Sequence, residues 1–157
     1  MRRDVIDAVD ARLLLALTKE PRATVLGLAE RVGLSRNTVQ ARLATLERDA
    51  LGSFERRVEP AALGYPLTAF VTAQVVQRQL AQVADALDAI PEVIEVFGVS
   101  GDDDLLIRVV AVDADDLYRV AGQILATDGI VRTRTALAMR DLVGHRLSPL
   151  LRRAAGG

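Results

Sequence analysis

Residues 28–39 read LAERVGLSRNTV, and this stretch decides the architecture of the first third of the chain. Gly33 stands where two helical patterns meet, and glycine is favoured where a helix ends in a left-handed residue. Ser35 is a typical N-cap residue, so a further helix is predicted to begin directly after it. Two helices joined by a turn of three or four residues that contains glycine form a helix-turn-helix.

Apolar residues on both sides of this stretch extend the pattern to three helices. The first helix is predicted to end before Pro21, and the second is predicted to begin after Thr24, a favoured N-cap residue. In each helix the apolar residues recur at helical spacing and form one inner face. These inner faces are Val9, Leu13, Ala16 and Leu17, then Val25, Leu28, Ala29 and Val32, and finally Val39, Leu43 and Leu46.

The first turns of the third helix present polar side chains that can read DNA bases. Arginine pairs with guanine, and asparagine or glutamine pairs with adenine, at the base edges. Arg42, farther along, is better placed for backbone phosphates, with a solvated charge as the alternative. A three-helix bundle without DNA contact is the alternative for the whole motif. The predicted DNA-binding residues are Ser35, Arg36, Asn37, Thr38, Gln40 and Arg42.

From Leu67 the hydrophobic period changes from 3.6 to 2, which indicates a strand with one buried face. Pro91 ends the helical pattern that follows, and residues 113–116 are predicted to cap a later helix. The order of elements is that of the ferredoxin-like split β-α-β motif. The predicted strands cover residues 67–76, 93–99, 105–112 and 130–139, and the helices between them cover 83–90 and 117–125.

The predicted fold class is therefore α+β, with two domains. An N-terminal winged helix-turn-helix domain is expected in residues 1–52, and a linker or wing strand in residues 53–66. Arg56 and Arg57 would bring such a wing to the DNA backbone. A C-terminal ferredoxin-like βαββαβ domain is expected in residues 67–157, with the RRAAGG segment 152–157 as a frayed tail.

Composition and charge limit the classes of protein and of partner. The net charge is −1, but residues 1–60 hold 11 Lys+Arg against 9 Asp+Glu, a balance of +2, and the remainder holds 9 against 12, a balance of −3. Basic residues are thus concentrated where phosphates would be met. The absence of cysteine excludes disulfides and thiolate metal sites. The apolar runs are too short to span a bilayer, and no signal-peptide pattern opens the chain, so we expect a cytoplasmic protein without a membrane partner.

A small sheet with both helices on one side leaves its other face uncovered. Val96, Val110 and Val112 make the predicted strands apolar on both sides. Large exposed apolar surfaces mark interfaces, and most soluble oligomers are symmetric assemblies of one chain. We therefore expect at least a dimer.

Three aspartates, Asp102, Asp103 and Asp104, follow Gly101 between two predicted strands. A hairpin turn favours aspartate for conformational reasons, and ligand binding or a cation site are the alternatives. Three consecutive residues cannot all face one ion, so neither a metal nor another cofactor is predicted. On the last strand, Arg132 and Arg134 share one face, where they are either solvated, paired across an interface or in contact with an effector carboxylate.

The chain resembles the Lrp/AsnC family of bacterial and archaeal transcription regulators, also called feast/famine regulators, over nearly its whole length. The combination of motifs is specific, although no single motif is. The matching segments are 6–10 (IDAVD), 28–35 (LAERVGLS), 59–64 (EPAALG) and 101–105 (GDDDL), together with Val39, Arg42, Leu43, Leu46, Glu47, Thr133 and Thr135.

The resemblance implies a regulator that binds double-stranded DNA as a homodimer and assembles into an octamer or a related ring. Members of the family bind an amino acid between dimers, near a Gly-Asp-x-Asp turn, which implies an amino-acid effector here. The effector-binding residues implied by the resemblance are Ser100, Gly101, Asp102, Asp104, Thr133 and Thr135.

Two departures from the family pattern bear on these expectations. Residues 50–54 (ALGSF) are one residue shorter than the family's segment after the third helix, so the linker strand is expected to start differently. Asp103 stands where the turn usually carries an aromatic residue. This change alters the polarity of the pocket and leaves the identity of the effector open.

An enzyme is the alternative function, because some relatives of this architecture act on tetrapyrroles. Such chemistry needs histidine or several converging acid–base groups. His145 is the chain's one histidine and has no evident partner in the sequence, so no catalytic residue is predicted. An RNA-binding module would need aromatic residues on the central strands, and the strand at 105–109 has none.

Overall fold

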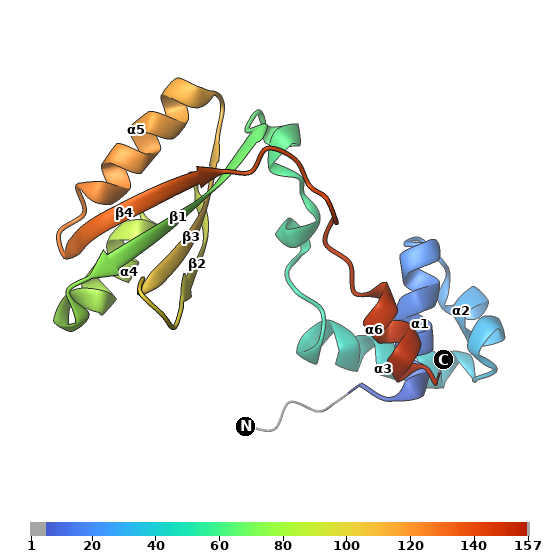
Figure 1. Ribbon diagram of the computed structural model, residues 1–157. Coiled ribbons are helices and arrows are strands. Elements are labelled where there is room, and N and C mark those ends of the chain that lie inside the picture. Colours follow the sequence, from blue (N-terminus) through green and yellow to red (C-terminus); the bar gives the residue numbers. More distant parts are fainter. Residues whose placement is uncertain (1–5, 157) are drawn as a thin grey trace. The chain divides into compact units, whose positions relative to one another are not determined.

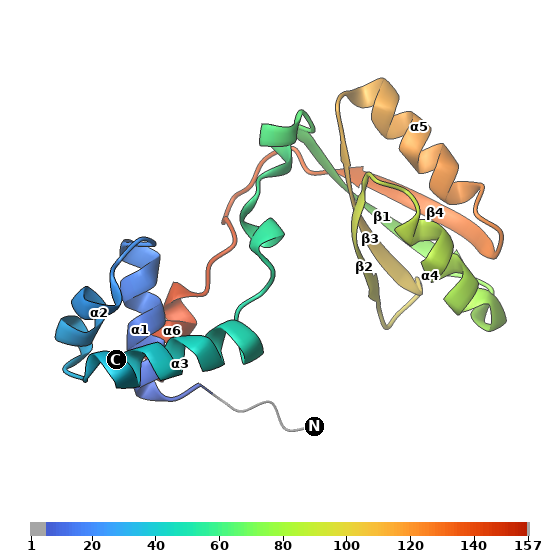
Figure 2. The ribbon, with the colours of Figure 1, turned by 180° about the vertical axis from the view of Figure 1, so that it is seen from behind.

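The computed structural model describes residues 6–156, which form two compact units (Figures 1 and 2). The helical unit comprises the chain up to Arg56 together with the segment from Val143 onward. The sheet unit comprises Arg57–Leu142. The chain therefore leaves the helical unit once, builds the sheet unit, and returns.

Three helices build the first part of the helical unit: α1 (Ala8–Lys19), α2 (Val25–Val32) and α3 (Arg36–Asp49). Asp7 caps α1 in a capping box with Asp10, and Thr24 caps α2. These side chains satisfy backbone N–H groups that the first helical turn leaves without partners. The predicted inner faces meet in one core, in which Leu13, Leu28, Ala29 and Val39 are buried.

The connection between α2 and α3 is the predicted helix-turn-helix turn. Gly33 adopts a left-handed conformation with φ +70°, and the Leu34 N–H donates to the Ala29 carbonyl, which closes the end of α2. Ser35 then caps α3 through the N–H of Thr38. Ala29 is 4% exposed, so a small side chain lies where the helices pack.

The prediction of a frayed C-terminal tail is wrong. Residues Ser148–Ala154 form a helix, α6, which packs on α1 and belongs to the helical unit. The boundary 67–157 for the second domain is therefore corrected to end at Leu142. Pro149 in the first turn suits a helix start, because that position needs no hydrogen-bonding N–H. The composition of the RRAAGG segment alone does not indicate this helix, because α1, on which the helix packs, lies at the other end of the sequence.

The linker contains no wing strand. Two short 3₁₀ helices, η1 (Phe54–Arg57) and η2 (Pro60–Leu63), occupy most of the region 53–66 in which a strand was expected. Pro60 lacks the N–H that a ladder needs, and Gly64 ends η2 with φ +91°. The first strand of the sheet begins at Leu67, as predicted.

The sheet unit has the predicted β-α-β-β-α-β order. Its strands are β1 (Leu67–Val75), β2 (Val93–Gly98), β3 (Leu105–Ala111) and β4 (Ile130–Leu137). A short 3₁₀ turn, η3 (Gln77–Gln79), leads into α4 (Leu80–Asp88), and α5 (Ala114–Leu125) lies between β3 and β4. The sheet is antiparallel in the order β2-β3-β1-β4, so β1 and β3 are the central strands and β2 and β4 are the edge strands (Figure 1).

One face of the sheet is covered by α4 and α5, and the core lies between them. Alternate residues of β1 and β3, such as Val71 and Ile107, are fully buried against Leu87 of α4 and Ile124 of α5. This burial follows from the period of two along each strand. The opposite face is open, as expected from the topology.

Of the three valines that suggested an apolar open face, only Val110, opposite Thr68, lies on that side of the sheet, and it is not exposed. Val96 pairs with Ile107 and so points to the helix-covered side, Val110 is buried, and Val112 follows β3. The exposed apolar side chains of the open face are Phe70 and Phe97, 38% and 46% exposed. The expectation of an apolar open face therefore holds through different residues.

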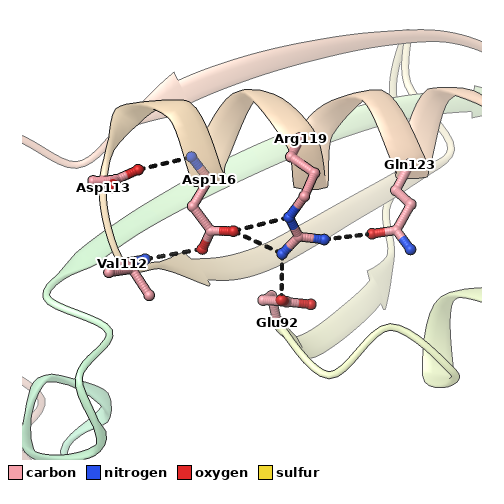
Figure 3. Close-up of polar contacts among 6 residues, drawn as sticks. All are labelled: Glu92, Val112, Asp113, Asp116, Arg119 and Gln123. Atoms are coloured by element: carbon pink, nitrogen blue, oxygen red, sulfur yellow. Dashed lines mark hydrogen bonds and ion pairs between the residues drawn. The ribbon is translucent and has the colours of Figure 1, made fainter.

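A polar network fixes the start of α5 (Figure 3). Asp113 caps the helix by accepting from the Asp116 N–H at 2.8 Å, as predicted. The Asp116 carboxylate accepts from the Val112 N–H at 3.0 Å and from Arg119, and these bonds lower the pKa of Asp116. Arg119 also contacts Glu92 in the turn before β2, so the network ties α5 to that turn.

Candidate nucleic-acid and effector sites

The polar side chains at the start of α3 are exposed, as a DNA-reading helix requires. Val39 and Leu43 turn the inner face of α3 toward α1 and α2. Arg36, Asn37 and Gln40 are consequently on the outer side and exposed. An arginine and two amides on one exposed helical surface can donate to guanine and pair with adenine.

Ser35 and Thr38 are held by each other. The Thr38 N–H donates to the Ser35 hydroxyl at 3.2 Å, and the two hydroxyls are 2.8 Å apart. Both side chains therefore shape the start of α3, and both residues are exposed. Their local role is to cap the helix that carries Arg36, Asn37 and Gln40.

The structure assigns Arg42 a different role from the predicted phosphate contact. Its Nη1 donates to carboxylates of Asp7 at 2.7 Å and Asp10 at 2.8 Å, so it joins α3 to the N-terminus of α1. The Asp10 N–H and Arg42 lower the pKa of Asp7, and the two carboxylates raise the pKa of Arg42. A guanidinium already paired with two carboxylates is poorly available to DNA. The two acids stand at the N-cap and in the first turn of α1, which is the feature of the sequence that could have indicated this pairing.

The turn between β2 and β3 is attached to the end of β1. The Asp104 carboxylate accepts from the Val75 N–H at 2.9 Å and from the Gln77 side chain at 2.6 Å. The Gln74 side chain donates to the Asp102 carbonyl at 2.6 Å. Asp104 thus holds the turn in place, and Gln74 and Gln77 are contributors that nothing in the sequence pattern distinguished.

The other residues of this turn remain available to a ligand. Ser100, Gly101 and Asp102 are exposed, and Gly101 has φ +123° with open space where a side chain would begin. Backbone N–H groups at such a glycine can be approached closely. The turn therefore offers a carboxylate and accessible backbone at the same place.

Asp103 separates from its neighbours and points toward β4. Its carboxylate lies 3.8 Å from Arg132 and 4.0 Å from Arg134. In the register of the sheet these two arginines pair with Gln74 and Thr72, which places them on the open face. The arginines are thus paired with Asp103, the residue at which the chain departs from the family pattern.

Thr133 and Thr135 lie on the other side of the sheet from these arginines. They pair with Ala73 and Val71, whose side chains point toward the helices. The Asp104 N–H donates to the Ala73 carbonyl, so Thr133 is level with the turn but separated from it by the width of β1, about 10 Å over two strand spacings. The predicted effector residues therefore form two groups. Ser100, Gly101, Asp102 and Asp104 belong to the turn, and Thr133 and Thr135 belong to β4.

Within residues 6–156, no cluster of three histidine, cysteine or acidic side chains has the arrangement of a metal site. In the same part of the chain, no helix is both long and apolar enough to cross a bilayer.

Two family models match the chain, one over each unit. The AsnC-type helix-turn-helix domain matches residues 6–47, and the Lrp/AsnC ligand binding domain matches residues 68–147. The second match alone spans half of the chain, and together the two matches include the polar start of α3 and the acidic turn. Both candidate sites therefore fall inside segments that the family models describe.

Individual relatives agree with the family models. The transcriptional regulator LrpA of Mycobacterium tuberculosis is 33% identical over 91% of this chain and 96% of its own length. A feast or famine regulatory protein of M. tuberculosis, solved in complex with L-methionine, is 30% identical with a TM-score of 0.78, over 91% of this chain and 98% of that chain. Escherichia coli AsnC shares the fold, with a TM-score of 0.80 and 23% sequence identity. The match covers 92% of this chain and 99% of that chain. The chain belongs to the Lrp/AsnC family of helix-turn-helix transcriptional regulators.

Proposed function

We propose that this regulator reads DNA with Arg36, Asn37 and Gln40 of α3 and responds to an amino acid bound at the turn between β2 and β3. The observation that supports DNA reading is the exposed polar surface of α3, a helix fixed by a buried inner face and by the Ser35 cap. Ser35 and Thr38 support that surface and contact phosphate.

A protein that binds the chromosome works in the compartment that holds it, which for a bacterial or archaeal cell is the cytoplasm. The relatives are named as regulators, so a tetrapyrrole enzyme is not favoured.

Alanine at Asn37 or Gln40 is expected to relax base preference at one position of the binding site. Losing a bidentate amide–adenine contact costs about 1–3 kcal/mol of discrimination at that position. The measurement is selection from a randomised duplex library by the parent protein and by each variant, followed by sequencing.

Gln82→Ala, which removes an exposed amide from α4, serves as the matched control and should leave the selected sequences unchanged. Identical sequence preferences in the parent and both α3 variants would remove α3 from the reading role.

The proposed effector site uses the turn residues Ser100, Gly101 and Asp102. An amino acid is a zwitterion, so its pocket needs an acceptor for the ammonium and donors for the carboxylate. The exposed Asp102 carboxylate can supply the acceptor, and the backbone at Gly101 can supply donors. Thr133 and Thr135 add hydroxyls at a second position, and Asp104 keeps the turn in place. The methionine complex of a relative makes L-methionine the first candidate to test.

Asp102→Asn is expected to weaken amino-acid binding by about tenfold to a hundredfold. This range corresponds to losing a charge-assisted hydrogen bond of about 1.5–3 kcal/mol. Calorimetry with L-methionine, followed by the other amino acids, measures the effect.

Asp85→Asn is the matched control on the exposed side of α4, and it should bind as the parent does. DNA affinity without effector should be equal in all three proteins, because Asp102 lies outside the helical unit. Equal amino-acid affinity in the parent and Asp102→Asn would place the pocket elsewhere.

We also propose a homodimer formed through the open face of the sheet, with dimers assembling further into an octamer. The supporting observation is the pair of exposed phenylalanines, Phe70 and Phe97, on a face that no helix covers. Apolar patches of this kind are uncommon on monomers.

Phe97→Asp is expected to shift the assembly toward smaller species, because pairing would then bury an unpaired carboxylate. Sedimentation velocity measures the change, and circular dichroism verifies that the variant is folded. Tyr118→Asp is the control, since Tyr118 is 84% exposed on α5, away from the open face. A monomeric parent, or an unchanged assembly in Phe97→Asp, would contradict the proposed interface.

A further inference from the structure

Two open hollows of the helical unit meet on α1. One, of about 600 Å³, lies between α1 and α6, and the other, of about 650 Å³, lies between α1 and α2. Arg12 and Leu15 line both hollows, so the two adjoin along α1, and together they are called a groove. The first hollow exists because α6 returns to pack beside α1.

Five basic side chains line this groove: Arg12, Lys19, Arg31, Arg152 and Arg153. We call it the basic groove. Glu20 is the one acidic residue in its lining, and it is paired with Arg31. Among the ion pairs of residues 6–156, none involves the other four basic residues. The groove therefore has four positive charges without a matching acid in the part of the chain that the structure describes.

The basic groove is separate from the surface of α3 that reads DNA. In Figure 1 α6 lies in front of α1 with α3 behind, and in Figure 2 the order is reversed, so α6 and α3 lie on opposite sides of α1. The inner face of α3 is turned toward α1 and α2, so Asn37 and Gln40 point away from the groove. One helical unit thus presents two distinct surfaces suited to nucleic acid.

We propose that the basic groove binds backbone phosphates of DNA, as a second contact surface independent of sequence. This inference rests on the proposed DNA binding and adds a site to it. Arginine forms bidentate bonds with phosphate, and four of the five cations are arginines. Duplex DNA carries one negative charge per about 1.7 Å of its axis, so a run of cations along a helix can meet several phosphates.

The chemistry of the groove favours a polyanion over the effector. A zwitterionic amino acid has no net charge to balance four cations. The uncharged lining residues are Leu15, Ala16, Val32, Pro149, Ala155 and Gly156, which have no side-chain hydrogen-bond donors or acceptors for reading bases. Apart from Glu20, which pairs with Arg31, the side chains that can make polar contacts there are all cations, and this favours phosphate binding over sequence recognition.

The test is the salt dependence of DNA affinity in the full chain. A double variant, Arg12→Gln with Arg152→Gln, removes two cations from the groove. A matched double variant, Arg78→Gln with Arg140→Gln, removes two exposed arginines of the sheet unit. The probe is a fluorescent 30-base-pair duplex of random sequence, followed by anisotropy from about 50 to 300 mM KCl.

Removing two phosphate contacts should reduce the slope of log K against log salt by about 1.8, because each contact contributes about 0.9. At 0.1 M salt the affinity should fall about tenfold to a hundredfold, equally on random and selected duplexes. The sheet-unit variant should keep the parent's slope, and both proteins should keep the parent's base preference.

An unchanged slope in the groove variant overturns the proposal. If that variant keeps its slope but sediments as a smaller assembly, the groove holds an acidic surface of a second copy, and the DNA assignment is wrong. If Asn37→Ala alters base preference while the groove variant keeps its slope, this inference fails alone. If the parent protein binds no duplex, the proposed function fails with it.

Discussion

Alanine at Gly129 is expected to destabilise the sheet unit by about 3 kcal/mol. Gly129 has φ +93°, a conformation that costs a side-chain-bearing residue about 1–2 kcal/mol. An added Cβ would lie 2.8 Å from Cγ2 of Val83 and 3.0 Å from Cβ of Gln79. Overpacking of this kind costs about 1–3 kcal/mol. For a unit of this size, the melting temperature should fall by more than about 10 °C.

Gly64→Ala provides a control with nearly the same backbone conformation, φ +91°, in the same unit. No atom lies within 4 Å of its added Cβ, so only the conformational cost of about 1–2 kcal/mol should appear. Both tyrosines, Tyr65 and Tyr118, are in the sheet unit and no tryptophan is present, so tyrosine fluorescence follows the unfolding of that unit. Equal losses in the two variants would show that steric contact at Gly129 contributes nothing.

Removing α6 is expected to destabilise the helical unit by about 2–3 kcal/mol. Ala11 and Leu13 are both fully buried although they lie on opposite sides of α1, so the helix is covered on two sides. The core shared with α2 and α3 contains Leu13, whereas α6 packs along α1 beside Arg12 and Leu15. A chain that ends at Gly144 would expose this side, at a cost comparable to unburying one leucine side chain.

Hydrogen exchange of the α1 amides measures this effect directly, since a less stable unit opens more often. A chain that ends at Ala155 retains α6 and is the control. Leu151→Asp, which places a charge on the half-buried side of α6, should accelerate exchange in α1 without shortening the chain. Unfolding followed by tyrosine fluorescence should be the same in all these proteins. Parental exchange rates in both α6 variants would show that α1 is stable without it.

The elements found from the sequence are those with strong local signals. The turn at Gly33 and Ser35 and the start of β1 at Leu67 were predicted correctly, because caps, left-handed glycines and hydrophobic period are local properties. The exposed surface of α3 followed from the same pattern. The acidic turn was located, and its three aspartates proved to have three different environments.

The features missed depend on partners distant in the sequence. Arg42 was assigned to phosphate because its pairing with Asp7 and Asp10 spans more than thirty residues. The return of the chain to form α6 beside α1 is equally nonlocal. Asp104 was expected to bind an effector, whereas its contacts with Val75 and Gln77 require the sheet register to be known. A local sequence pattern cannot distinguish a free side chain from one that is hydrogen-bonded to a residue far away in the sequence.

The return of the chain also sets an order of events during synthesis. A ribosome completes the sheet unit, through Leu142, before it makes α6. Domains usually fold in the order in which they are made. Here the helical unit is begun first and completed last, because α6 can pack on α1 only after the end of the chain has left the ribosome. The nascent protein would therefore have a folded sheet unit, free to pair with a second copy, before its DNA-binding helices reach their full stability.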